Sequence, residues 1–474
     1  MQQLLQDTLA TAPLGVTILL SLVVILLHSF VKNSERAQAV VSVAGLAIAA
    51  VAAFWTFPMR GTAFSGMVMT GGYASAMSVL FIVGAALTIL LARDYLGKIG
   101  ADFGEFHILV LLAVTGMMAF ASGLDLIVTF IGLEVMSVCL YVLAGMTRGR
   151  LEANEASLKY FLLGAFATGF FLYGIALIYG AAGTTNLAAI AQSASARAQD
   201  PLFLAGCGLL LVGFAFKVGA VPFHMWVPDV YEGAPSVVTG FMSTAAKASA
   251  FAAFMLVFIA KFDIAHGRIS LALAILSVAS MVLGNVVAIS QTSIKRMLAY
   301  SSIAHAGYML IGLAAGTPAA ISGVLFYLLS YLFTNIGAFG VVSIIENEKQ
   351  ENVSIESFAG LGTRRPLLGA LMSLFLFSLV GLPPLSGFFG KYYIFYAAIA
   401  EGYTWLTIVG VLTSMISIYY YLRVIVVMYF RSDTDDTAVP VTTLGTASLL
   451  LSAAGVLVFG FFPRLITDIA DTLF

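Results

Sequence analysis

The chain has 474 residues, of which 61% are hydrophobic and only 9% are charged, and its formal net charge is −1. With a mean hydropathy of +1.03, this composition excludes an ordinary soluble domain and indicates a protein with many membrane spans. The apolar runs are too long for the strands of an outer-membrane barrel. The balanced charge provides no basic surface for nucleic acid, so the lipid bilayer is the first partner that the sequence predicts.

Fourteen apolar segments are long enough to cross a bilayer as helices, which predicts an all-α polytopic membrane protein. The first segment follows an uncharged-to-acidic start, whereas a cleavable signal peptide carries positive charge there, so we interpret it as a retained helix. The expected spans are residues 12–31, 37–57, 73–92, 106–122, 123–146, 155–180, 202–223, 236–260, 270–290, 294–315, 318–345, 366–400 (broken), 404–430 and 443–462.

The connections between these spans carry most of the charged residues, and they do so unevenly. Most lysines and arginines, including Arg148, Lys295 and Arg296, fall in the connections opposite the two termini. Since positive charge is retained on the cytoplasmic side of a membrane, both termini are predicted to be periplasmic. The expected location is the inner membrane of a bacterial cell.

Two of the spans are interrupted by proline. Residues 218–222 read Val-Gly-Ala-Val-Pro, and residues 380–384, five spans later, read Val-Gly-Leu-Pro-Pro. Segments five spans apart cross the membrane in opposite directions, so the pattern predicts two inverted five-helix repeats with broken helices 7 and 12. Each interruption frees backbone groups and forms either a hydrated site or a simple packing kink. The expected division of the single membrane domain is 1–104 (first three spans), 105–260 and 261–431 (the repeats), and 432–474 (last span).

Four ionisable side chains lie well inside apolar runs: Glu134, Lys217, Lys247 and Lys391. An ammonium near the bilayer centre costs about 2.5–3.5 kcal/mol on insertion scales, so such residues are retained for a reason. One interpretation is that they bind and release protons inside the membrane. The alternative is a static buried ion pair that fixes helix packing. Three lysines facing one central carboxylate favour the proton pathway.

Three further residues are candidates for a proton relay. His224 directly follows an interruption, and His305 lies in a string of serines and a tyrosine within a span; each has the alternative role of an interhelical hydrogen bond. Lys159 lies near the start of a span, where a lysine can extend to the interface. Asp229 and Glu232 are interpreted as solvated acids in a loop, with an entry funnel for protons as the alternative.

The sequence offers no redox or metal chemistry of its own. Cys139 and Cys207 fall inside apolar runs, and the five histidines are scattered without ligand spacing. It also contains no glycine-rich nucleotide motif. We therefore expect no cofactor and no metal in this chain, and any energy for transport comes from an ion gradient or a partner subunit.

Two strings in the sequence carry a family resemblance. Residues 217–229 read KVGAVPFHMWVPD and continue as YEGAP at 231–235, and residues 295–305 read KRMLAYSSIAH. Both resemble signatures of the antiporter-like membrane subunits found in respiratory complex I and in multisubunit sodium/proton antiporters. The pattern of spans extends this resemblance over nearly the whole chain.

The resemblance implies a role for each buried ionisable residue. Glu134 and Lys217 match the coupled pair of the fifth and seventh spans, Lys247 matches the central lysine of the eighth, and Lys391 matches the terminal one. His305 and Lys159 match positions along the same hydrophilic axis. NADH, flavin, iron–sulfur clusters and quinone chemistry would belong to other subunits of the complex, which would be the partners of this chain.

The function that follows is a proton-translocating membrane subunit of complex I, coupled to quinone reduction elsewhere in the complex. A subunit of a multisubunit sodium/proton antiporter is the alternative within transport. A scaffold that conducts nothing and only holds partners together is the alternative outside transport.

Overall fold

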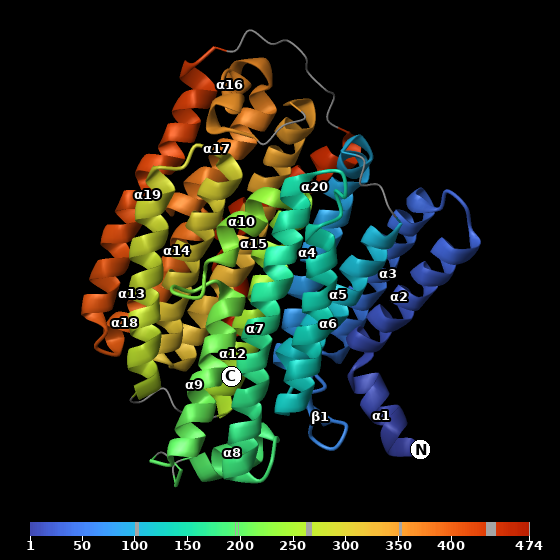
Figure 1. Cartoon of the computed structure of the whole chain (residues 1–474), viewed down its shortest axis with the longest axis vertical. Coiled ribbons are helices and arrows are strands. Elements are labelled where there is room, and N and C mark those ends of the chain that lie inside the picture. Colours follow the sequence, from blue (N-terminus) through green and yellow to red (C-terminus); the bar gives the residue numbers. More distant parts are fainter. Residues whose placement is uncertain are drawn as a thin grey trace.

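A computed structural model of the chain describes residues 1–99, 104–194, 196–197, 199–261, 268–349, 353–432 and 442–473. Within these residues the molecule is a bundle of long helices that run roughly side by side (Figure 1). One short antiparallel hairpin, β1 (Gly61–Ala63) paired with β2 (Val68–Thr70), lies at the lower end of the bundle in this view.

The helices follow one another in three groups. The first is α1 (Gln2–Ala10), α2 (Ala12–Phe30), α3 (Glu35–Thr56) and α4 (Gly72–Lys98). The second is α5 (Glu105–Ser122), α6 (Leu126–Ala144), α7 (Leu151–Ala182), α8 (Leu187–Ala194), α9 (Pro201–Val218), α10 (Trp226–Gly233), α11 (Ser236–Phe241), the π-helical turn η1 (Met242–Ala246), α12 (Lys247–Phe254) and a second π-helical segment, η2 (Met255–Lys261). The third is α13 (Arg268–Ile289), α14 (Ile294–Ala315), α15 (Pro318–Lys349), the 3₁₀ turn η3 (Ile355–Phe358), α16 (Leu361–Arg364), α17 (Pro366–Val380), α18 (Ser386–Ala400), α19 (Thr404–Phe430), α20 (Thr443–Phe461) and α21 (Arg464–Ala470).

The predicted fold class is confirmed. In the described part of the chain, 13 helices are long and apolar enough to cross a membrane. The remaining expected span, residues 366–400, is divided into α17 and α18, which have 15 residues each. At the other interruption α9 ends at Val218, and the chain becomes helical again at α10, beyond the end of the predicted span 202–223. Since α9 rises toward α10 in Figure 1 while α17 descends toward α18, the two broken segments run in opposite directions.

Burial separates the centre of the bundle from its periphery. The apolar window of Ser236–Phe258, which covers α11, η1 and α12, is 100% buried, and that of α14 is 94% buried. The corresponding share is only 28% for α2, whose exposed side chains are large and apolar, as expected for a helix that faces lipid. The two central helices therefore carry side chains that neither lipid nor water reaches from outside.

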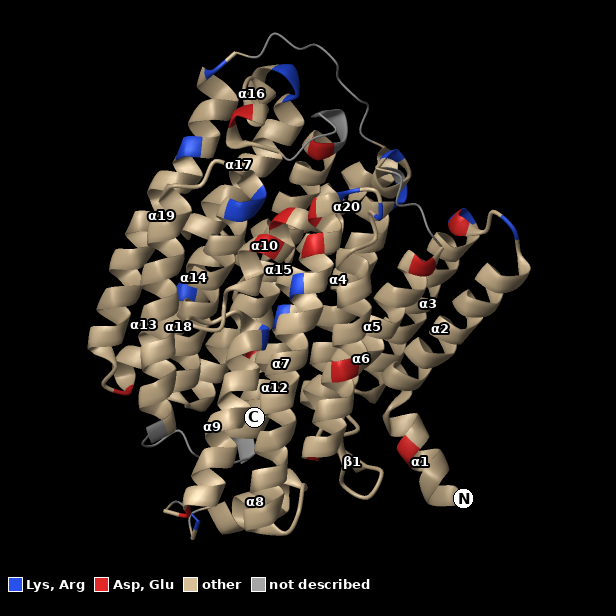
Figure 2. Cartoon of the chain, viewed as in Figure 1, with Lys and Arg blue, Asp and Glu red and all other residues tan. Residues whose placement is uncertain are grey.

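Charged residues are distributed unevenly along the bundle (Figure 2). Most of the coloured segments lie in its upper half, around α10, α16 and α20, and a smaller number lie at mid-height among the central helices. Both chain ends lie in the lower half of Figure 1.

One sequence expectation about the charged connections is wrong. Asp229 and Glu232 belong to helix α10 and not to a loop, because the chain turns helical again at Trp226. Lys295 is likewise not a connection residue: α14 begins at Ile294, and the lysine is only 1% exposed.

Candidate functional site

Both broken segments end their first half in the same way. Helix α9 stops at Gly219 and α17 stops at Gly381, with φ angles of 75° and 90°. This left-handed backbone conformation suits glycine, since it lacks the Cβ that would clash, and it terminates a helix by closing its last carbonyls. The interruptions that the sequence predicts at these two positions are therefore present, and each lies next to a buried lysine.

Lys217 occupies the last turn of α9 and is buried. Its Nζ donates to Ser137 Oγ at 2.7 Å and to Tyr141 Oη at 3.4 Å, both on α6. Glu134 precedes Ser137 by three residues, or about 4.5 Å of helix. The half-buried Glu134 carboxylate accepts instead from Thr168 Oγ1 on α7 at 2.8 Å. Within the described residues no ion pair joins Glu134 to Lys217, and Ser137 on the same helix takes the lysine's hydrogen bond.

Lys247 lies at the start of α12, inside the most buried span. Its Nζ donates to the carbonyl oxygen of Ser302 at 2.8 Å and to the hydroxyl of the same residue at 2.5 Å. Ser302 belongs to α14, the other central helix. The ammonium is thus held between the two helices of the bundle that are most shielded from solvent and lipid.

His305 follows Ser302 by one turn of α14 and is also buried. Its Nδ1 lies 2.6 Å from Tyr327 Oη, and its Nε2 lies 3.2 Å from Tyr421 Oη. The Tyr421 hydroxyl also forms a hydrogen bond with Ser301 Oγ. Both ring nitrogens are therefore engaged with hydroxyls, which can donate or accept as the imidazole changes tautomer.

Lys391 contacts the other interruption directly. Its Nζ donates to the carbonyl oxygens of Leu379 at 3.1 Å and Val380 at 2.8 Å, and to Ser414 Oγ at 2.8 Å. The two carbonyls end α17, where helix carbonyls lack intrahelical partners and carry the negative end of the helix dipole. The same ammonium lies 4.8 Å from the centre of the Tyr308 ring. The lysine therefore completes the hydrogen bonding of the broken helix.

The groups described above follow one another along α14. Ser302 and Tyr308 are six residues apart, which corresponds to about 9 Å of helix, and His305 lies between them with its ring 5.6 Å from that of Tyr308. One end of the row holds Lys247 and the other end holds Lys391. We call Lys247, Ser302, His305, Tyr308 and Lys391 the α14 row. Lys247 contacts Ser302, His305 packs against Tyr308 and Lys391 lies over the Tyr308 ring, while Ser302 and His305 are one helical turn apart on α14.

The remaining candidates lie off this row. Lys159 pairs with Glu155 at 2.7 Å and with Asp229 at 2.8 Å, and its side chain is 42% exposed. Arg296 joins the same group through Asp229 at 2.9 Å and Glu232 at 2.8 Å. The ion pairs thus connect α7, α10 and α14 on the charged side of the bundle.

His224 lies within the first interruption and is half-buried. In the described structure its Nδ1 has no hydrogen-bond partner. The freed backbone at this break is satisfied by other groups: Val221 N donates to Ser280 Oγ at 2.9 Å, and Trp226 Nε1 donates to the Phe216 carbonyl at 2.9 Å.

Sequence reasoning missed one buried acid. Glu346 is fully buried near the end of α15, where it pairs with Lys295 at 3.3 Å and Arg150 at 3.2 Å. The sequence predicts a span that ends at residue 345 and places Lys295 and Arg150 in the connections. The helix continues past the predicted end of the span and carries Glu346 into the buried bundle.

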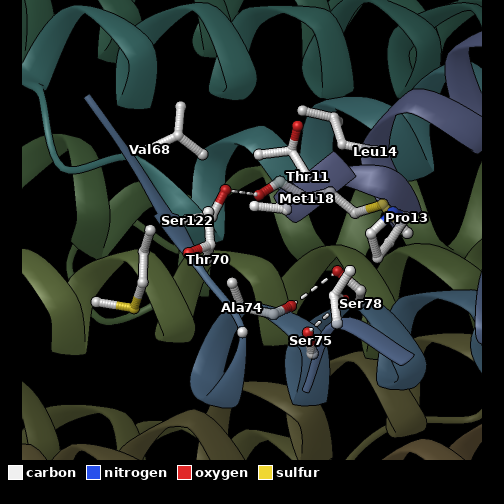
Figure 3. Close-up of a pocket in the computed structure, with 14 residues that line it drawn as sticks. Thr11, Pro13, Leu14, Val68, Thr70, Ala74, Ser75, Ser78, Met118 and Ser122 are labelled. Carbon is white, nitrogen blue, oxygen red and sulfur yellow. Dashed lines mark hydrogen bonds between the residues drawn. The ribbon is translucent and has the colours of Figure 1, made fainter. Parts of the chain in front are cut away.

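The described residues contain no group of three or more His, Cys, Asp or Glu side chains that could hold a metal ion. Figure 3 shows a small cavity of ≈ 20 Å³ between α1, α2, α4 and α5, lined by hydroxyls that include Thr11, Thr70, Ser75, Ser78 and Ser122. It has room for about one water molecule, and none of the candidate residues lines it.

Comparison with known proteins places this arrangement in a family. The model of the "NADH:quinone oxidoreductase/Mrp antiporter" membrane region matches residues 123–417. NADH-quinone oxidoreductase subunit N of Trichlorobacter lovleyi is 45% identical over 456 residues, covering 95% of this chain and 94% of the relative. The chain belongs to the subunit N family. Subunit N of Salinibacter ruber is 46% identical over 457 residues, and the match covers 93% of this chain and 90% of that relative.

Solved structures agree with this assignment. A chain of respiratory complex I from Thermus thermophilus is 36% identical, with a TM-score of 0.84, and the match covers 97% of this chain and 99% of that chain. A chain of the Mrp complex from Dietzia shares only 22% identity but has a TM-score of 0.87, covering 98% and 97% of the two chains, so that likeness shows a common fold. The family resemblance drawn from the sequence strings is confirmed.

Three sequence features had favoured subunit N within this family. The length of the chain fits fourteen spans, and the broken twelfth span carries Lys391 where subunit M typically has glutamate. The string at 155–161, EASLKYF, resembles the sixth-span motif of subunit N.

Proposed function

We propose that this chain is a proton-translocating membrane subunit of NADH-quinone oxidoreductase, and that protons move through its buried ionisable residues. The observation that carries the proposal is the α14 row, since hydroxyl, imidazole and phenol side chains on successive turns of one helix lie between two buried lysines, Lys247 and Lys391. Groups of this kind can pass protons when their hydrogen bonds rearrange. A scaffold that only holds partners together has no need for such a row at its most buried level.

In this proposal the proton path begins at Glu134 and Lys217 and continues through Lys247 and Lys391. A change of charge at Glu134 would change the field at Lys217, which binds Ser137 one turn away. Two unit charges 4 Å apart interact by roughly 4 kcal/mol at an effective dielectric constant of 20. Glu134 and Lys217 lie beyond ion-pair distance, so their interaction is weaker than this, but it is of the same order as the roughly 2.3 kcal/mol needed to move one charge through a potential of 100 mV.

We assign supporting positions to the remaining candidates. His305 relays protons inside the row. Lys159 lies at the charged end of the bundle, beside the entrance of the proposed proton path, and His224 lies at the first break. This chain carries no cofactor in the proposal: NADH oxidation and quinone reduction belong to other subunits, and the neighbouring antiporter-like subunits transmit the charge change.

We also propose the arrangement of the chain in the inner membrane of a bacterial cell. Residues 105–260 and 261–431 form the two inverted repeats, with residues 1–104 and 432–474 flanking them. The opposite directions of α9–α10 and α17–α18 support this division. The concentration of Lys and Arg at one end of the bundle supports termini in the periplasm.

Lys247→Ala tests the function in the whole complex, in inverted membrane vesicles. We expect normal assembly but fewer protons pumped per NADH oxidised, since removal of a positioned proton-transfer group slows its step on the order of 100-fold. Lys32→Ala is the matched control, because Lys32 is exposed in the connection between α2 and α3. Full pumping by an assembled Lys247→Ala complex would establish the scaffold role, and pumping that depends on sodium would favour an antiporter.

A further inference from the structure

A second buried polar cluster lies outside the α14 row, around the Glu346 carboxylate. Its Oε1 contacts Arg150 NH1 at 3.2 Å and Lys295 Nζ at 3.3 Å. Its Oε2 accepts hydrogen bonds from the hydroxyls of Tyr95 and Ser236, each at 2.5 Å. A buried carboxylate with four partners is fully satisfied, and the cluster is not an accident of a frayed helix end.

The partners of Glu346 come from segments far apart in the chain. Tyr95 lies on α4, Arg150 directly precedes α7, Ser236 begins α11 and Lys295 lies in the first turn of α14. Two further bonds tighten the group: Ser236 N donates to Tyr95 Oη at 3.0 Å, and Lys295 Nζ donates to the Ala234 carbonyl at 2.7 Å. The short connection between α10 and α11 is therefore held from several sides.

This cluster fixes the relative position of the two central helices. In the first turn of α14, Lys295 donates a hydrogen bond to the Ala234 carbonyl, just before the start of α11. Seven residues further along α14, or about 10.5 Å, Ser302 receives Lys247. Because α11, η1 and α12 form one continuous span, the anchored start at Ser236 determines how far along α14 the Lys247 ammonium reaches.

The helix between these two levels is not regular. The π-helical turn Met242–Ala246 ends directly before Lys247, and such turns are often found at functional sites. A π turn accommodates an extra residue and rotates the side chains that follow it. The direction of Lys247 therefore depends on a local distortion whose upstream end is held by the Glu346 cluster.

We infer that Glu346 is a positioning residue for proton transfer: by anchoring the starts of α11 and α14 to one another, it holds Lys247 against Ser302. This inference rests on the proposed function, because Lys247 must transfer protons for its position to matter. Without the carboxylate, Lys295 and Arg150 face each other in a buried site, and the anchor at Ser236 loosens.

The test is Glu346→Gln in the whole complex, measured as protons pumped per NADH in membrane vesicles and normalised to the amount of assembled complex. Glutamine keeps the size of the side chain but removes its charge. We expect pumping per complex to fall about two- to tenfold, the coupling typical of residues in one hydrogen-bond network. Glu346→Asp, which keeps the charge, should recover part of the loss.

Glu356→Gln is the matched control. Glu356 pairs with Arg431 on the exposed surface of the charged side, so its loss should leave pumping unchanged. A purely structural role for Glu346 would lower the amount of assembled complex and leave the protons pumped per NADH intact, which would overturn the inference.

A double-mutant cycle shows whether Glu346 acts through Lys247. If it does, Glu346→Gln combined with Lys247→Ala pumps no less than Lys247→Ala alone; independent, multiplying losses would overturn the inference.

If Glu346→Gln does not assemble, the charge-balanced variant Glu346→Gln with Lys295→Met replaces it, and normal pumping by that variant overturns the inference. Normal pumping by Lys247→Ala would refute the proposed function itself, whereas normal pumping by Glu346→Gln beside an impaired Lys247→Ala refutes only the positioning role.

Discussion

The two broken segments end their first helices alike but use their lysines differently. At the first break, Val221 N bonds to Ser280 and the Phe216 carbonyl bonds to Trp226, while Lys217 points to hydroxyls of α6. At the second break, Lys391 itself binds the free carbonyls of α17. The same type of helix break is therefore found beside two lysines with different contacts: Lys217 makes no hydrogen bond to the break, whereas Lys391 bonds to its carbonyls.

The largest effect that would test this contrast is expected from Lys391→Met. It removes a buried ammonium from the Leu379 and Val380 carbonyls; Val380 keeps a hydrogen bond from Ser414 Oγ at 3.4 Å, whereas a buried polar group left unsatisfied costs about 1–3 kcal/mol. We expect less assembled complex together with loss of pumping, measured by native gel electrophoresis and by protons pumped per NADH.

Lys217→Met is the matched control for that substitution. Its break is satisfied by other residues, so we expect loss of pumping with assembly close to normal. Equal assembly defects in the two variants would show that the breaks do not differ in the way their contacts indicate.

A smaller effect is expected from alanine at the two glycines. The left-handed conformation costs a residue with a Cβ roughly 1–2 kcal/mol, so Gly219→Ala and Gly381→Ala should both lower thermal stability of the complex. At Gly381 the new Cβ would also lie 3.2 Å from Lys391 Cδ, whereas at Gly219 it would meet Val227 at 2.9 Å.

Only Gly381→Ala should therefore reduce pumping beyond its effect on stability. Gly208→Ala in α9 serves as control, because a Cβ there meets nothing within 4 Å. A pumping defect of equal size in Gly219→Ala would contradict the separation of Lys217 from its break.

The smallest effect is expected from the α6 partners of Lys217. Ser137→Ala removes a bond of 2.7 Å, and Tyr141→Phe removes a longer one of 3.4 Å. A hydrogen bond to a charged group contributes about 1.5–3 kcal/mol, and each substitution leaves the other partner in place, so Ser137→Ala should slow proton transfer about tenfold and Tyr141→Phe less. The pumping rates of the two variants are compared at saturating NADH. A larger defect in Tyr141→Phe would show that Ser137 is not the main partner of Lys217.

The sequence was sufficient for the spans and for the positions of the breaks, because both depend on local features: length of apolar runs, glycine and proline. It could not identify Ser137 or Ser302 as lysine partners, since that depends on how each helix is rotated against its neighbour. The same limit explains Glu346. Its burial depends on Arg150, Lys295 and Tyr95 arriving from other helices, and no local pattern around residue 346 reports that.

The burial of α11–α12 and α14 has a consequence for biogenesis. These two spans are the most enclosed and also the least apolar of the candidate spans, and the first carries Lys247, an ammonium that is unfavourable in lipid. Neither is well suited to leave the translocon alone. We expect them to wait for later helices, α15 above all, before they settle in the bilayer, so in ribosome-bound chains truncated before residue 318 these two segments should stay open to proteolysis although the earlier, more apolar spans are inserted.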